Sequence, residues 1–126
     1  MIQKRIILVF SILLGISNFS FAQLKKANSY FKLGSYNDAI TIYEKVLKKD
    51  SSNIDATQKI AFSYRKLKDY NNAEIYYARA TKINPEQSDN YLYYGQSLKN
   101  NNKVKEARIQ FQNFVVKNPN SFMGKL

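Results

Sequence analysis

The chain has 126 residues, a formal net charge of +11 and a hydrophobic content of 44%, which predicts one folded domain of ordinary core content. It contains no cysteine, and this excludes disulfides, thiolate chemistry and cysteine-ligated metals. No metal and no cofactor is expected. The positive charge favours acidic proteins, anionic lipid or nucleic acid as neighbours. Because the basic residues are spread along the chain, an ordinary solvated surface is the alternative.

Residues 1–22 have the pattern of a secretory signal peptide. The basic start "MIQKR" is followed by the apolar run "IILVFSILLGI" and by "SNFSFA", which ends in small residues. Cleavage after Ala22 would leave Gln23 as the new N-terminus. A membrane anchor is the alternative, but a membrane-spanning helix needs roughly 20 apolar residues, and this run is shorter. We therefore expect export, and no transmembrane span after cleavage.

A repeat with a period of 34 residues runs through the rest of the chain. Three small residues, Ala39, Ala73 and Ala107, recur at this interval. The same interval relates Ala27, Ala61 and Gly95, and also Tyr43, Tyr77 and Phe111. A constant offset of this size is the mark of a stacked repeat architecture. Residues 23–121 then form three units, at about 20–53, 54–87 and 88–121.

Each unit is predicted to contain two helices. In the middle unit, apolar residues at steps of three and four mark a first helix near Ile60 and Tyr64, and a second from about Tyr70 to Ile83. Pro85 blocks continuation of the second helix. Six small residues are expected to let the paired helices approach closely: Ala27, Ala39, Ala61, Ala73, Gly95 and Ala107.

This 34-residue helix–turn–helix unit, with its small, aromatic and proline columns, resembles the tetratricopeptide repeat. The resemblance implies an all-α, right-handed α-solenoid of three units, whose stacking buries a continuous core. It also implies a protein-interaction module in which the first helices line a concave groove for a partner polypeptide. Residues carried over to that groove are Asn28, Phe31, Lys32, Phe62, Arg65, Lys66, Tyr93, Gln96 and Lys99.

The predicted groove combines cationic and aromatic side chains, which suits a protein or peptide partner with acidic groups and apolar anchors. The alternative is ordinary surface, since aromatics beside helix interfaces are often packing residues. The family's carboxylate clamp of Lys, Asn and Arg is not preserved here. Its five columns hold Leu24, Asn28, Lys59, Asp89 and Tyr93, and only Asn28 matches.

Two other classes of function compete with an adaptor. An enzyme has little support, because the chain has no histidine, no cysteine and only four glycines, which leaves general-base work to carboxylates, lysines or tyrosines. Binding of nucleic acid or another anionic polymer is suggested by the charge and the ten tyrosines. Most of those tyrosines lie in packing columns, so no nucleic acid is expected.

Phrases such as "YGQSLK" are similar to the N-terminal repeat region of envelope proteins of the outer-membrane protein A family in flavobacteria-like lineages. The resemblance implies a periplasmic or outer-membrane-associated adaptor or scaffold. The alternative is the N-terminal docking arm of a larger, peptidoglycan-associated outer-membrane protein.

The last residues, 122–126, are predicted to start a truncated or capping helix. Asn120 or Ser121 offers an N-cap before one apolar turn. A solenoid normally ends in a polar-faced cap. Self-association through the C-terminal end, where Phe111, Phe114 and Val115 risk exposure, is therefore a further expectation.

Overall fold

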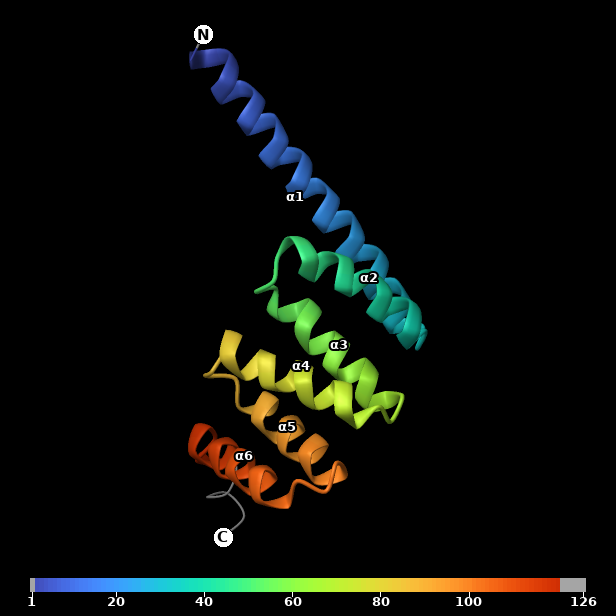
Figure 1. Ribbon diagram of the computed structural model, residues 1–126, viewed down its shortest axis with the longest axis vertical. Coiled ribbons are helices and arrows are strands. Elements are labelled where there is room, and N and C mark those ends of the chain that lie inside the picture. Colours follow the sequence, from blue (N-terminus) through green and yellow to red (C-terminus); the bar gives the residue numbers. More distant parts are fainter. Residues whose placement is uncertain (1, 121–126) are drawn as a thin grey trace.

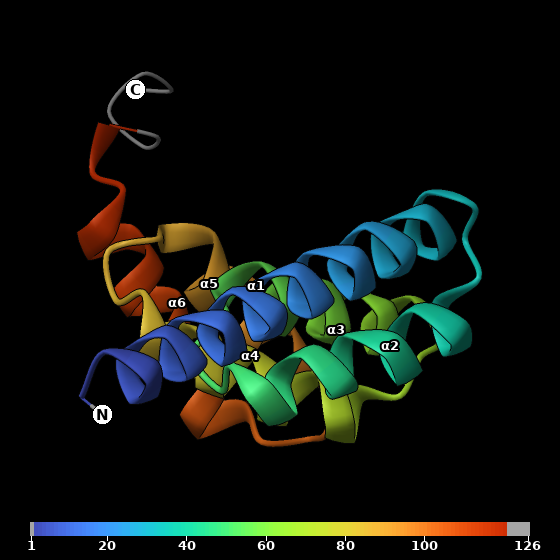
Figure 2. The ribbon, with the colours of Figure 1, turned by 90° about the horizontal axis from the view of Figure 1, so that it is seen from above.

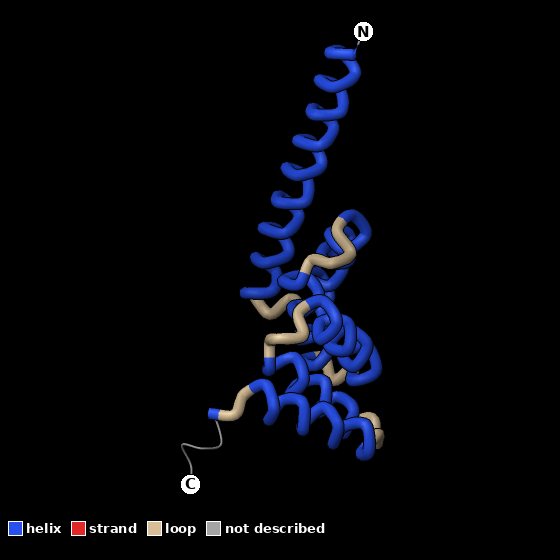
Figure 3. Tube along the Cα trace, turned by 90° about the vertical axis from the view of Figure 1, so that its left-hand side faces the viewer, coloured by secondary structure: helices blue, strands red, loops and turns tan. Residues whose placement is uncertain are grey.

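The computed structural model describes residues 2–120, without the side chains of residues 2, 10–14, 16 and 17. The described residues form helices joined by short turns, with no strand among them, as Figure 3 shows. This confirms the predicted all-α fold. The helices are α1 (Ile2–Lys32), α2 (Tyr36–Lys49), α3 (Ile54–Lys66), α4 (Tyr70–Ile83), α5 (Ser88–Asn100) and α6 (Val104–Lys117).

Consecutive helices pack as antiparallel pairs, and the pairs stack in chain order from α1 to α6 (Figure 1). Each helix contacts the one before it and the one after it, and α1 also touches α3. Figure 2 looks along the stack and shows α1 and α2 lying across the later helices. A stack of this kind buries apolar side chains between neighbouring pairs, as expected for an α-solenoid.

The turn inside each helix pair has the same backbone geometry. Gly34, Lys68 and Asn102 have φ values of 76°, 61° and 62°, which places one left-handed residue every 34 positions. In each turn the next amide donates back over the helix end, as from Asp69 N to Tyr64 O at 2.9 Å. These bonds satisfy carbonyls that a helix C-terminus leaves without partners.

The two helices of the middle unit, α3 and α4, begin with conventional side-chain caps. The Asn53 side chain accepts a hydrogen bond of 3.0 Å from the Ala56 amide at the start of α3. Asp69 does the same for Asn72 at the start of α4, at 3.1 Å. Such caps satisfy first-turn amides that have no partner within the helix.

The six predicted small residues are all buried at helix contacts. At Gly95 on α5 the approach is so close that a Cβ would lie 2.7 Å from Cε1 of Phe111 on α6. The larger core side chains, Tyr43, Ile60 and Leu98, are fully buried around them. The small residues therefore let the helix backbones approach closely, and the large side chains pack around these contacts.

The N-terminal part of α1 extends beyond the helix pairs (Figures 1 and 3). The helix continues without interruption through Ala22 and Gln23, where cleavage is predicted. Apolar side chains on this segment are exposed, for example Leu8 and Phe21. Among the described residues, no helix has both the length and the apolar character that a membrane crossing requires. The helix predicted to start at 122–126 lies outside the described residues.

Candidate functional site

The predicted groove residues lie on α1, α3 and α5, the first helices of the three pairs, and we call this surface the first-helix face. Lys32, Lys66 and Lys99 are exposed on it. The other six are half-buried: Asn28, Phe31, Phe62, Arg65, Tyr93 and Gln96. The polar ends of the lysines are thus free to meet a partner, while the aromatic rings are partly engaged in packing.

An aromatic cluster joins the first two units at this face. The Phe31 and Phe62 rings have centroids 5.3 Å apart, and the Tyr36 ring lies 6.0 Å from Phe31 and 6.1 Å from Phe62. Aromatic pairs at these separations contribute about 0.5–1.5 kcal/mol beyond their buried area. Phe31 and Phe62 therefore help to hold α1 and α3 together, whatever they do for a partner.

Arg65 joins the second and third units through cation–π contacts. Its guanidinium carbon lies 4.4 Å from the Tyr93 ring centre on α5 and 5.1 Å from the Phe62 ring centre on its own helix. The Lys66 ammonium lies 5.5 Å from the same Phe62 ring. Two positive charges are thus gathered beside two rings in the middle of the first-helix face.

The Arg65 guanidinium has no carboxylate partner among the described residues, since no salt bridge to it is present there. Its Nε is buried and makes no hydrogen bond. Burial raises the pKa of the nearby Tyr77 hydroxyl, and the positive charge of Arg65 and a hydrogen bond with its side chain oppose that rise. Because Arg65 as a whole is only half-buried, an anionic group could reach the rest of its side chain, though not the buried Nε.

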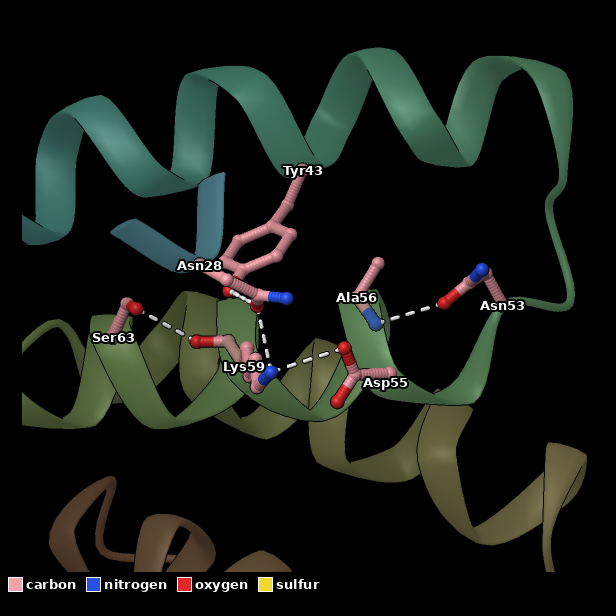
Figure 4. Close-up of polar contacts among 7 residues, drawn as sticks. All are labelled: Asn28, Tyr43, Asn53, Asp55, Ala56, Lys59 and Ser63. Atoms are coloured by element: carbon pink, nitrogen blue, oxygen red, sulfur yellow. Dashed lines mark hydrogen bonds and ion pairs between the residues drawn. The ribbon is translucent and has the colours of Figure 1, made fainter. Parts of the chain in front are cut away.

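A polar network around Asn28 occupies the neighbouring part of the face (Figure 4). Asn28 Oδ1 accepts hydrogen bonds from the Tyr43 hydroxyl at 2.5 Å and from Lys59 Nζ at 2.7 Å. Lys59 also pairs with Asp55 at 3.0 Å. Burial, with a smaller contribution from the Asp55 charge, raises the pKa of Tyr43 well above its ordinary value.

This network changes the role of two residues in the family's clamp columns. The side-chain oxygen of Asn28, the one matching clamp residue, is already bonded to two donors of the chain itself. Lys59 is directed to Asn28 and Asp55, and its ammonium also lies 5.8 Å from the Phe31 ring centre. The sequence did not indicate this role of Lys59, because its offset of 31 residues from Asn28 does not follow the 34-residue period.

The structure does not bring all the predicted groove residues together. Arg65, Lys66, Phe62 and Tyr93 form one group, but Lys99 borders a different surface. It lines a hollow of about 580 Å³ on α6, together with Arg108 and several apolar side chains. Among the described residues there is no group of three carboxylate, histidine or cysteine side chains placed to hold a metal ion.

Comparison with known families agrees with the repeat. Family models described as TPR repeat and tetratricopeptide repeat match residues 27–68, 54–87 and 89–121. No curated protein matches the chain significantly in sequence.

Solved tetratricopeptide domains have the same fold. The first such domain of Spaghetti (RPAP3), bound to the HSP90 peptide SRMEEVD, is 28% identical, with a TM-score of 0.73 and 82% of each chain covered. The first domain of human RPAP3 is also 28% identical, with a TM-score of 0.70 over 82% of this chain and 81% of that one. The second human domain, in complex with the HSP70 peptide SGPTIEEVD, is 23% identical and has a TM-score of 0.76, over 83% and 88%. The chain belongs to the tetratricopeptide repeat proteins.

Proposed function

We propose that the protein is an exported adaptor of the cell envelope, which binds an acidic segment of a partner polypeptide on its first-helix face. Within this proposal, Arg65 and Lys66 receive the acidic group, while the Phe62 and Tyr93 rings contact apolar parts of the segment. The protein supplies a binding surface and no catalytic group.

The observation that carries the proposal is the state of Arg65. Its guanidinium lies beside the Phe62 and Tyr93 rings, and it has no carboxylate partner among the described residues. A guanidinium fixed in place loses little freedom when a carboxylate binds, and such charge-assisted hydrogen bonds are stronger than neutral ones. A carboxylate is thus the group that best completes this site.

The chemistry of related domains supports an acidic partner. The first RPAP3 domain binds SRMEEVD, a peptide with two adjacent glutamates and a terminal aspartate. In the present chain the cation of the clamp columns, Lys59, is already bonded to Asn28 and Asp55, whereas Arg65 and Lys66 lie outside those columns. We therefore expect a partner whose acidic residues lie along the middle of the bound segment.

The envelope part of the proposal rests on residues 1–22. Their basic start, apolar run and small residues before Gln23 are the features of a signal peptide. The alternative remains the docking arm of a larger, peptidoglycan-associated outer-membrane protein. The intact mass of the native protein from fractionated cells tests both, because it reports both ends of the chain.

A charge-reversal experiment tests the binding site. The probe is fluorescently labelled SRMEEVD, titrated into the full chain and followed by fluorescence anisotropy. We expect Arg65→Glu with Lys66→Glu to weaken binding at least tenfold, because a carboxylate of the peptide would meet anions in place of cations. The matched control is Lys45→Glu with Lys82→Glu on α2 and α4, where both lysines are exposed.

The control separates a site from a general charge effect. Both double variants change the net charge equally, so similar losses of affinity would point to non-specific attraction and overturn the first-helix face as the site. Unchanged binding by the Arg65 and Lys66 variant would overturn it as well. Thermal unfolding of both variants checks that each remains folded.

A further inference from the structure

Gln23 lies close to the start of the repeat-forming part of α1. Counting back one 34-residue period from Ile54, the first residue of α3, or two periods from Ser88, the first residue of α5, leads to Ser20. Most of the segment before Ser20 extends beyond the helix pairs (Figure 1). Cleavage after Ala22 would remove that segment and only three residues of the repeat-forming helix. Gln23 would then begin the stack.

The side chain of Gln23 is not engaged in the fold. It is half-buried, and its amide makes no hydrogen bond among the described residues. In the continuous helix, the backbone amide of residue 23 donates to the carbonyl of residue 19. Cleavage removes that carbonyl, and the first nitrogen of a helix has no backbone acceptor. A reaction between the new α-amine and the side chain of Gln23 would therefore break no hydrogen bond of the stack.

An N-terminal glutamine has a reaction of its own. The α-amine attacks Cδ of the side-chain amide, so that a bond forms between the backbone nitrogen and Cδ, and the bond from Cδ to Nε2 breaks. The side-chain nitrogen leaves as ammonia and takes the proton that the amine loses. The attack requires an uncharged amine, and part of an α-amino group is uncharged near neutral pH. The product is the neutral lactam pyroglutamate, and the step needs no oxidant, reductant or second substrate.

A free ammonium group at Gln23 would be poorly placed. The N-terminus of a helix carries a partial positive charge, so a cation there is unfavourable. Lys25 and Lys26 follow within the first turn. The Lys49 ammonium, at the end of α2, lies 4.1 Å from the ring centre of Phe19, one turn before Gln23. Cleavage would thus add a cation to a place where three lysines already gather.

The acidic residue at this end of α2 is already engaged. Asp50 follows the last residue of the helix, and its carboxylate accepts hydrogen bonds of 3.2 Å from the Ser52 hydroxyl and of 3.2 Å from the Asn53 side-chain amide. These bonds hold the carboxylate toward the turn before α3. Loss of the ammonium charge is therefore the direct way to relieve the repulsion at the start of α1.

We propose that Gln23 cyclises to pyroglutamate after cleavage behind Ala22, so that the mature stack begins with a neutral lactam. The proposal rests on the export proposed above, because only cleavage exposes the α-amine of Gln23. The ring removes one positive charge beside Lys25, Lys26 and Lys49. It thereby stabilises α1 at the end that cleavage shortens.

Mass spectrometry of the native protein from fractionated cells tests the proposal. Amines are first blocked by reductive methylation, so that a free Gln23 cannot cyclise during handling. Digestion before aspartates then releases residues 23–37, because Asp38 is the first acidic residue after Gln23. We expect this peptide to lack a methylated N-terminus and to be lighter than the free glutamine form by the mass of one ammonia.

The results separate this proposal from the export on which it rests. A peptide that begins with a methylated Gln23 would support cleavage after Ala22 and overturn the cyclisation. A peptide that contains residues before Gln23 would contradict that cleavage, and both proposals would fall. Gln23→Asn is the matched control: its shorter side chain cannot close the same ring, so its N-terminus should be methylated.

Thermal unfolding of the exported wild type and of Gln23→Asn measures the effect on stability. At low salt we expect the wild type to unfold at a temperature about 1–5 °C higher, because the variant keeps an ammonium group at a helix N-terminus. The difference should shrink at high salt, which screens the repulsion. Equal unfolding temperatures at low salt, or a difference that salt does not change, would overturn the electrostatic role of the lactam.

Discussion

The ring of Phe111 on α6 lies directly over Gly95 on α5. A Cβ at residue 95 would come within 2.7 Å of Phe111 Cε1 and 2.8 Å of Cδ1. Glycine costs roughly 0.5–1 kcal/mol relative to alanine in a helix, so its presence in the middle of α5 is explained by this contact. The two helices of the third pair can approach only because residue 95 has no side chain.

We expect Gly95→Ala to lower the free energy of unfolding by about 1 kcal/mol. Overpacking costs about 1–3 kcal/mol, and the improved helix propensity of alanine offsets part of that. Urea denaturation of four proteins, wild type, Gly95→Ala, Phe111→Leu and the double variant, measures the coupling. The two changes should be less than additive, because a smaller side chain at residue 111 leaves room for the methyl group. Additive losses would contradict the contact.

Lys68→Gly should stabilise the protein. Lys68 has φ of 61° in the turn between α3 and α4, a conformation that costs a residue with a Cβ about 1–2 kcal/mol. Glycine is more flexible in the unfolded chain, and this offsets part of the benefit, so we expect a net increase of roughly 0.5 kcal/mol in the free energy of unfolding. Thermal unfolding measures it. Lys82→Gly inside α4 is the matched control, and it should destabilise by about 1 kcal/mol.

Asn28→Ala should lower the free energy of unfolding by about 1–3 kcal/mol. The change removes the acceptor for both Tyr43 and Lys59 and leaves the Tyr43 hydroxyl without its partner, which is the costly outcome for a buried donor. Chemical denaturation measures the loss. Asn71→Ala, at an exposed position of α4, is the control. Equal effects at the two positions would show that the network contributes nothing.

Stability should fall in alkaline solution as the tyrosines titrate. Burial is the largest cause of a raised pKa at Tyr43, Tyr64, Tyr76, Tyr77 and Tyr94. An unfolded tyrosine titrates near pH 10. Above that pH the unfolded chain releases protons that the folded chain retains, so the free energy of unfolding decreases with pH. Below about pH 9 this effect is absent.

Two exposed lysines also have raised pKa values, and they too lower the free energy of unfolding as the pH rises. The pKa of Lys103 is raised by its hydrogen bond to Glu74, and that of Lys117 by its hydrogen bond to Glu86. Denaturation midpoints measured from pH 7 to pH 11 test the prediction. Tyr77→Phe should make the alkaline decline shallower, because it removes one titrating hydroxyl. A profile that stays flat to pH 11 in the wild type would contradict the assignment.

The 34-residue period determined much of the fold. It predicted paired helices, and the structure has α4 at Tyr70–Ile83, as the apolar spacing and Pro85 indicated. It also led to the small residues, because a column that holds alanine or glycine in every unit marks a place where backbones meet. These features depend on local helix geometry and on patterns that each unit repeats, so they can be read from a single sequence.

The candidate site depended on contacts that the period does not specify. The bond from Lys59 to Asn28 and the contact of Arg65 with the Tyr93 ring join residues of different units and different columns. Their geometry depends on how the helix pairs rotate against each other and on which rotamers the packing allows. The amino-acid sequence by itself determined which helices form and which small residues permit their approach. Only the tertiary structure decided which polar groups are used internally and which are left for a partner, because that depends on distances between side chains from separate helices.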